Sequence, residues 1–279
     1  MKDRKRSKKT RARVQRRRKR LQYVVIIAFV LSIVVTSVVL FKSVLDRPSS
    51  SQAVIPSVEP NAAIVDHLSL TYPNQTFIQT ATNILEGAGF TVDYYPGEQV
   101  TVELYRALPT HGYDVILLRV HSALREGTKF LALFTCEPYS TTKYWYEQWI
   151  DQVGIVEYQL GGDSYFGIGH EFILSGINGR FQNTVIIMMG CNGLEYTPLA
   201  EAFIQKGAKV YVGWNESVSA SHTDHATITL LQHLIVQRQT IGTAIEETLQ
   251  EVGPDPTDNS ILLYYPLEAA NFAIQNVET

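Results

Sequence analysis

Short apolar runs alternate along the chain with longer segments whose apolar residues recur at helical spacing. The runs typical of buried strands cover 62–68, 91–95, 113–120, 184–190, 208–214 and 261–265, and the helical segments cover 74–87, 100–108, 197–207, 223–236 and 240–252. In the first helical segment, Phe77, Ala81, Ile84 and Leu85 form one apolar stripe that Gly87 ends. This alternation predicts an α/β fold, with a mostly parallel sheet and helices on both faces.

Two further apolar stretches interrupt the alternation between the third and fourth strand. They cover 130–135 and 153–160, and they indicate additional β structure appended to the main sheet. We therefore expect one α/β domain over residues 61–279.

Two of the predicted strands run directly into a reactive side chain. The strand over 113–120 is followed by His121, and the strand over 184–190 is followed by Cys191. Carboxyl ends of parallel strands share one edge of a sheet, so His121 and Cys191 are expected to meet there. The alternatives are a hydrogen-bonded histidine at a strand end and a structural disulfide between Cys191 and Cys136, the only other cysteine.

A cysteine attacks a carbonyl group as the thiolate, so it needs a base and donors for the developing oxyanion. His121 is the predicted base and Cys191 the predicted nucleophile. Gly190 and Asn192-Gly193 flank Cys191 with small residues that leave backbone amides free. The amides of Cys191 and Ser122 are the expected oxyanion donors.

Charge is distributed very unevenly along the chain. Residues 1–20 contain 13 Lys or Arg and the single acid Asp3, whereas the remainder contains 11 basic and 26 acidic residues. Tyr23 to Phe41 carries no charge, and 19 helical residues at about 1.5 Å each match a bilayer core. We therefore expect a basic tail over 1–20 and a transmembrane helix over 21–41, with a cleaved signal peptide as the alternative.

The basic tail also predicts the orientation of the chain. Positive charge next to a membrane span favours the cytoplasm, so the domain at the C-terminal side is expected outside the cytoplasmic membrane. Residues 42–60 are rich in Ser and Pro and are typical of a linker. The partners of residues 23–41 are then lipids, and we expect no nucleic acid, although a basic arm that binds phosphates is the alternative.

Several other classes of site have no support in the sequence. His222, Asp224 and His225 lie close together but show no recognisable zinc spacing, so we expect no metal site. There is no P-loop and no Gly-x-Ser-x-Gly motif, which argues against a nucleotide enzyme or a serine hydrolase. We expect no cofactor.

The segments VILLRVHS, ending at Ser122, and TVIIMMGCNG, ending at Gly193, resemble the caspase-like cysteine peptidases. That family includes clostripain, gingipains, separase and the CHAT domains, and its pattern is an apolar strand ending in His-Gly and a later one ending in a small residue and Cys. The segments LAEAFIQKGAKVYVGW, SVSASHTDHATITLLQHLI and QTIGTAIEET resemble the run that follows the cysteine in CHAT domains. Ser122 stands where that family usually has Gly.

This resemblance implies a caspase-like three-layer fold and the His121/Cys191 dyad. It also implies that residues near the strand after the cysteine form the substrate pocket, which by position is the segment 214–224, with Trp214, Glu216 and Asp224 as its candidates. Glu216 or Asp224 then offers a carboxylate to a basic substrate side chain, or each is a loop acid or helix cap. Trp214 forms either pocket wall or core.

The sequence thus predicts a membrane-anchored cysteine endopeptidase that cleaves peptide or protein substrates through a thioester intermediate. The alternative is a catalytically inactive module of the same fold that binds a peptide or protein outside the cytoplasm.

Overall fold

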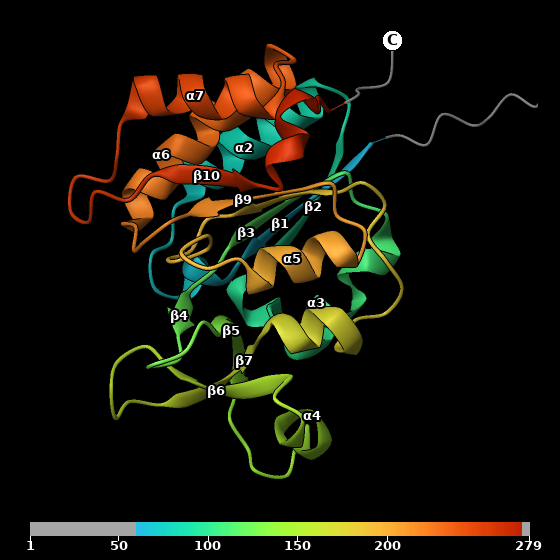
Figure 1. Ribbon diagram of the computed structural model, residues 1–279, viewed down its shortest axis with the longest axis vertical. Coiled ribbons are helices and arrows are strands. Elements are labelled where there is room, and N and C mark those ends of the chain that lie inside the picture. Colours follow the sequence, from blue (N-terminus) through green and yellow to red (C-terminus); the bar gives the residue numbers. More distant parts are fainter. Residues whose placement is uncertain (1–59, 275–279) are drawn as a thin grey trace, which may run out of the picture. The chain divides into compact units, whose positions relative to one another are not determined.

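The computed structural model describes residues 60–274, which form two β-sheets and the helices packed on them (Figure 1). The predicted basic tail and membrane span, and nearly all of the linker, lie outside the described residues. Within 60–274, no helix combines the length and the apolar character needed to cross a membrane.

The larger sheet has six strands in the order β10-β9-β8-β3-β1-β2. All its neighbouring strands are parallel except β10, which pairs antiparallel with β9. This confirms the predicted mostly parallel sheet. The strands are β1 (Asn61–Asp66), β2 (Thr91–Pro96), β3 (Val115–Arg119), β8 (Val185–Met188), β9 (Val210–Trp214) and β10 (Leu262–Tyr265).

Alternate residues of these strands point to opposite sides of the sheet. Both sets of side chains are apolar and buried, so helices cover both faces. Ile64, Leu117 and Ile187 belong to the buried cluster on one face. Their neighbours in the sequence, such as Val65 and Ile186, belong to the cluster on the other face. The first face packs against α2 (Gln75–Gly87), α6 (Ala220–Leu231) and α7 (Ile241–Val252), and the second against α3 (Val102–Ala107) and α5 (Pro198–Gln205).

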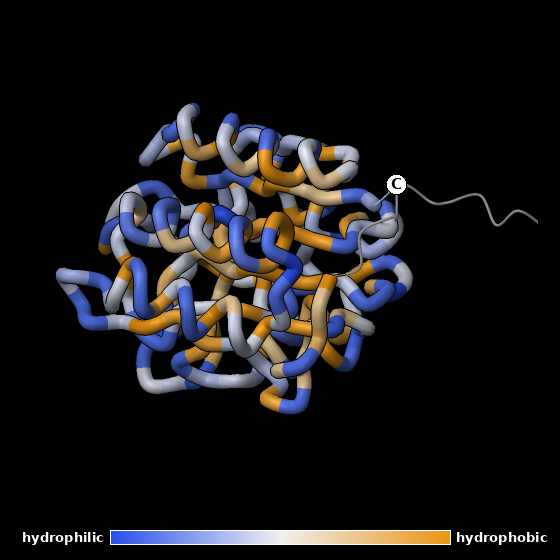
Figure 2. The backbone as a smooth tube through the Cα atoms, turned by 90° about the horizontal axis from the view of Figure 1, so that it is seen from above, coloured by the Kyte–Doolittle hydropathy of each residue, from blue (hydrophilic) through white to orange (hydrophobic). Residues whose placement is uncertain are grey.

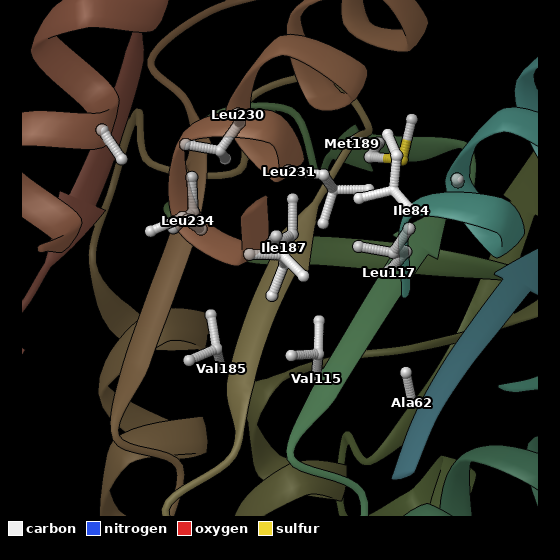
Figure 3. Packing of buried hydrophobic residues seen from close by; sticks show 14 of the residues in the cluster. Ala62, Ile84, Val115, Leu117, Val185, Ile187, Met189, Leu230, Leu231 and Leu234 are labelled. Carbon is white, nitrogen blue, oxygen red and sulfur yellow. The ribbon is translucent and has the colours of Figure 1, made fainter. Parts of the chain in front are cut away.

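Figure 3 shows the packing on the first face. Leu230, Leu231 and Leu234 from the end of α6 and the following turn lie over Val115 and Ile187 of the central strands. Viewed from above, the strongly hydrophobic stretches run through the interior, and hydrophilic stretches predominate in the peripheral loops (Figure 2). The buried apolar faces that periodicity predicts are therefore the ones that hold the layers together.

The smaller sheet is antiparallel, with strand order β4-β5-β7-β6. Its strands are β4 (Ser122–Leu124), β5 (Leu131–Pro138), β6 (Val153–Glu157) and β7 (Ser164–Ile168), and a short helix α4 (Trp145–Trp149) lies between β5 and β6. The predicted additional β structure corresponds to β5 and β6. Strands β4 and β7 and helix α4 were not predicted.

Short helical turns complete the chain. The 3-10 turns cover His67–Leu70, Gly97–Gln99, Leu108–His111 and Leu267–Asn271, and π-helical turns cover Phe172–Gly176 and Gln232–Val236. The expected strand over 62–68 is too long at its end, because β1 ends at Asp66 and the 3-10 turn His67–Leu70 follows directly. The strand before Cys191 also ends earlier than predicted, at Met188.

Candidate active site

His121 and Cys191 follow neighbouring parallel strands and line the same cavity. Strands β3 and β8 are parallel neighbours with Leu118 opposite Met188. The segments that follow them therefore leave the sheet side by side, at the carboxyl ends of the strands. The cavity at this edge has a volume of about 430 Å³, and both side chains are part of its wall. The structure thus brings together the two residues that strand-end position singles out.

The turn that carries Cys191 is attached to the end of β9. The Asn192 amide donates to the Glu216 carbonyl at 2.9 Å, and the Leu194 amide donates to the Trp214 carbonyl at 2.8 Å. Asn192 has a φ of 60°, a left-handed conformation that Asn tolerates better than most residues. These contacts fix the direction in which Cys191 leaves the sheet.

Gly190 allows the turn to approach strand β3. A Cβ atom at this position would lie 2.4 Å from the Val120 carbonyl oxygen and 2.6 Å from both Ser122 Oγ and Met188 Cε. No side chain fits at those distances. The small residue before Cys191 is therefore required by the close approach of the His121 and Cys191 segments.

The two segments are also joined by a hydrogen bond. Ser122 Oγ donates to the Cys191 carbonyl oxygen at 2.6 Å. The Cys191 thiol is half-buried and contacts the backbone of Val218, whose amide donates to Sγ at 3.5 Å and whose carbonyl oxygen is 3.6 Å from Sγ. Both contacts hold the thiol against the loop that follows β9.

His121 is held by a contact to Thr71 and by four aromatic rings. Its Nε2 lies 2.9 Å from Thr71 Oγ1, and its ring contacts Tyr72, Phe134, Tyr158 and His67 with centroid distances of 5.3 to 5.9 Å. In the tautomer in which Nε2–H donates to Thr71 Oγ1, the lone pair on Nδ1 accepts the proton. Among the described hydrogen bonds, none joins the His121 ring to Cys191 Sγ.

The environment keeps His121 neutral. Burial lowers the pKa of His121 to about 4, and the nearby charge of Arg119 acts in the same direction. The neighbouring His67 is fully buried, with its Nε2 2.9 Å from the Tyr158 hydroxyl, and burial followed by repulsion from His121 lowers its pKa to about 4 as well. At neutral pH, His121 is therefore available as a base.

The backbone around both residues can supply oxyanion donors. The Phe134 amide donates to the His121 carbonyl at 3.0 Å, and Ser122 pairs with Leu133 in the antiparallel ladder. Hydrogen-bonded and non-hydrogen-bonded pairs alternate in such a ladder, so the Ser122 amide points away from β5. The Cys191 amide donates to no backbone carbonyl among the described residues.

The structure corrects the predicted substrate-binding residues. Trp214 is buried in the core, and its Nε1 donates to Thr223 Oγ1 at 2.9 Å. Asp224 is buried and forms hydrogen bonds with Arg119. Glu216 is exposed and is not part of the cavity wall. The segment 214–224 does contribute to the cavity wall, through Val218, Ser219, Ala220, Ser221 and Thr223. Helix α6 begins at Ala220, so its first turn lines the cavity and Asp224 on the next turn faces inward.

Asp224 belongs to a buried ion cluster beneath the cavity. Arg119 donates through Nε and Nη2 to Asp224 at 2.7 and 2.9 Å, through Nη1 to Asp66 at 2.7 Å, and through Nη2 to the Tyr72 carbonyl at 2.8 Å. Burial acts to lower the pKa of Arg119, but its hydrogen bonds to Asp224 and Asp66 outweigh burial and raise it. Arg119 therefore stays charged and holds the loop that carries Thr71 and Tyr72.

The remaining candidates have no part in the cavity. Cys136 and Cys191 are both free thiols, and Cys136 Sγ donates to the Glu98 carbonyl at 3.2 Å, which excludes the disulfide alternative in this structure. His222 Nε2 lies 3.2 Å from the Gly253 carbonyl oxygen. Within residues 60–274, no three His, Cys, Asp or Glu side chains are grouped to hold a metal ion.

Sequence reasoning missed several residues of the site. Thr71, Tyr72 and His67 lie just after β1, where the expected strand over 62–68 includes only His67. The one signal for this group is position, because β1 ends at the same sheet edge as β3 and β8.

No protein-family model and no curated protein matches the sequence. The structure is similar to the crystal structure of the Arg-specific cysteine proteinase gingipain R, with a TM-score of 0.44 and 11% identity over 72% of this chain and 43% of that chain. The chain thus matches less than half the length of that proteinase. The parallel-rich sheet with helices on both faces is the α/β architecture that the sequence pattern predicts.

Proposed function

We propose that this domain is a cysteine endopeptidase in which His121 and Cys191 form the catalytic dyad. The observation that carries the proposal is their position in the wall of one cavity, after the carboxyl ends of adjacent parallel strands. The neutral state of His121 supports it further. The substrate is then a peptide or protein.

The proposed reaction follows from these contacts. His121 Nδ1 takes the thiol proton as Cys191 Sγ attacks the scissile carbonyl, and the amides of Cys191 and Ser122 stabilise the oxyanion. The C–N bond breaks as His121 returns the proton to the leaving amine, which leaves a thioester on Cys191. Water, deprotonated by His121, then attacks the thioester and releases the carboxylate product and the free thiol.

A peptide-digestion assay with the full chain, read by mass spectrometry, tests the proposal. A mixture of peptides should be cut by the wild type and by Cys136→Ala, which removes the other free thiol, but not by Cys191→Ala. His121→Ala should lower the rate by about 10²-fold or more. Cleavage that survives Cys191→Ala would overturn the assignment of the nucleophile.

The second candidate is an inactive peptide-binding module. It is favoured by one observation, namely that His121 Nε2 is bonded to Thr71 and the thiol contacts Val218, with no bond between the two side chains. In this case no peptide would be cut. Iodoacetamide would then alkylate Cys191 at the same rate in the wild type and in His121→Ala.

We also propose that the chain is anchored in the cytoplasmic membrane by residues 21–41, with the domain outside. The support is the uncharged run from Tyr23 to Phe41 after the basic tail. The full chain should stay with membranes in alkaline carbonate, and protease added to intact cells or spheroplasts should degrade the domain. Release into the soluble fraction would overturn the anchor.

A further inference from the structure

The side of the cavity beside the dyad is apolar. Leu68, Val120, Met189 and Val218 contribute to its wall, and all four are buried residues. Leu68 comes from the turn after β1. Val120 follows β3, Met189 follows β8, and Val218 lies in the loop after β9. A substrate side chain that enters here therefore replaces water against hydrocarbon.

A further part of the cavity wall is formed by the start of α6 and is uncharged. Ala220, Ser221 and Thr223 contribute to it. Thr223 Oγ1 already accepts a hydrogen bond from Trp214 Nε1. This part of the wall thus offers a methyl group and small hydroxyl groups, and no carboxylate or cation.

The acids nearest to the cavity are closed off. The four carboxylate oxygens of Asp66 and Asp224 accept hydrogen bonds from Arg119, Tyr94 and Asn74. Both side chains are almost fully buried, and neither is part of the cavity wall. A lysine or arginine of a substrate would therefore enter without a carboxylate to bind, and an unpaired buried charge is costly.

A third acid, Asp255, lies behind the start of α6 and is closed off in the same way. Its oxygens accept from the amide and hydroxyl of Ser219 and from the amides of Thr257 and Asp258. Asp255 is fully buried. It anchors Ser219, which does line the cavity, and leaves no oxygen for a ligand.

Among the described residues that line the cavity, none is a Lys or Arg that could bind an acidic substrate side chain. Arg119 is 0% exposed, and its guanidinium donates to Asp66, Asp224 and the Tyr72 carbonyl. The cavity therefore has a neutral wall although a charged cluster lies directly beneath it.

We propose that this cavity selects an uncharged, apolar side chain, such as Leu or Met, for the substrate residue that precedes the scissile bond, and rejects Arg, Lys, Asp and Glu. This inference rests on the proposed function, because it assigns the substrate class of the same dyad. The specificity-determining residues are Leu68, Val218 and Ala220.

Peptidyl acyloxymethyl ketones with one leader peptide, Ac-Ala-Ala, and a final residue of Leu, Met, Arg, Lys or Asp test the inference on the full chain in mild detergent. In labelling, His121 takes the thiol proton, Cys191 Sγ forms a bond to the methylene carbon, and the acyloxy group leaves as a carboxylate. The product is a stable thioether whose mass identifies the reagent. Iodoacetamide, which has no peptide, reports the accessibility of Cys191.

The second-order rate constant for labelling Cys191 should be at least about tenfold higher for the Leu and Met reagents than for the charged ones. Equal or faster labelling by the Arg, Lys or Asp reagent would overturn the substrate class but leave the dyad in place. If iodoacetamide modifies Cys191 but no ketone does, the proposed function fails and the inference fails with it.

A variant that gains a preference for the Arg reagent tests the inference more directly, because misfolding can lower a labelling rate but does not raise one selectively. Ala220→Glu places a carboxylate in the cavity wall at the first residue of α6, where the helix dipole favours an acid. It should raise the rate with the Arg reagent and lower the rate with the Leu reagent. His225→Glu, on the exposed side of the same helix, is the matched control and should change neither rate. No gain in Ala220→Glu, with Leu labelling unchanged, would overturn the assignment of this cavity.

Discussion

The Arg119 guanidinium binds both oxygens of the Asp224 carboxylate, at 2.7 and 2.9 Å, across a separation of 105 residues. The same guanidinium binds Asp66 and the Tyr72 carbonyl. Strand β1, strand β3, helix α6 and the loop beside His121 therefore meet on a single buried side chain. The cluster sets the floor of the proposed active site.

Removal of this guanidinium should strongly destabilise the protein. Arg119→Met keeps the apolar stem but leaves Asp66 and Asp224 buried without their partner, at an expected cost of about 3 to 5 kcal/mol in the free energy of unfolding. Urea unfolding followed by tryptophan fluorescence measures this. Arg125→Met is the matched control, because the Arg125–Asp151 pair is exposed and 3.4 Å long, and it should cost less than about 1 kcal/mol. Equal losses in both variants would contradict the buried cluster.

His121 should titrate far below an ordinary histidine. Its pKa is about 4, so it is neutral in the folded protein at pH 5, where an unfolded histidine is mostly charged. NMR of ¹³C-labelled histidine should show a midpoint near pH 4 for His121 in the folded chain and near about 6.5 in concentrated urea. A folded midpoint above 6 would contradict the burial argument.

The lowered pKa values of His67 and His121 also make the stability of the fold depend on pH. Because the pKa values of His67 and His121 are depressed, the unfolded state binds more protons between about pH 4 and about pH 6.5, and both histidines destabilise the fold as the pH falls through that range. Each changes the free energy of unfolding by up to about 1.4 kcal/mol per pH unit.

Cleavage that needs neutral His121 should persist to about pH 5 and fall with a midpoint near 4.

Gly190 should not tolerate a side chain. Gly190→Ala forces a Cβ against the Val120 carbonyl oxygen and Ser122 Oγ, so the Cys191 turn must move. We expect lower stability and at least about tenfold slower labelling of Cys191 by the Leu reagent, since small misplacements cost large factors in rate. Gly87→Ala is the control, because a Cβ there meets nothing within 4 Å, and the helical position should gain up to about 1 kcal/mol. A well-folded, fully reactive Gly190→Ala would contradict the close approach.

Much of the main sheet could be predicted because its signals are local. Apolar runs and helical stripes gave the parallel strands and their covering helices, and strand-end position gave His121 and Cys191. Strand β4 gave no such signal, since Ser122–Leu124 has three residues and is partly exposed. Its β character comes from pairing with β5, which periodicity does not report.

The surroundings of the dyad could not be predicted because they depend on contacts between distant segments. Asp224 has the sequence context of a loop acid or helix cap, but in the structure it is buried and bound to Arg119, which lies 105 residues away in the sequence. Thr71 meets His121 across 50 residues. Such pairs follow from how the strand ends converge, which local pattern does not specify.

Thr71 should set the tautomer of His121. Thr71→Val keeps the shape of the side chain but removes the hydroxyl 2.9 Å from Nε2, so Nε2–H loses its acceptor and the ring is free to expose either nitrogen as the base. We expect the turnover rate for a peptide with Leu before the scissile bond to fall by about 10-fold or more, with little change in KM, because the hydroxyl acts on the base and does not touch the substrate. Thr71→Ser restores the hydroxyl and should recover most of the rate. An equal loss in Thr71→Ser, or a change confined to KM, would indicate that this residue acts on the shape of the loop and not on the histidine.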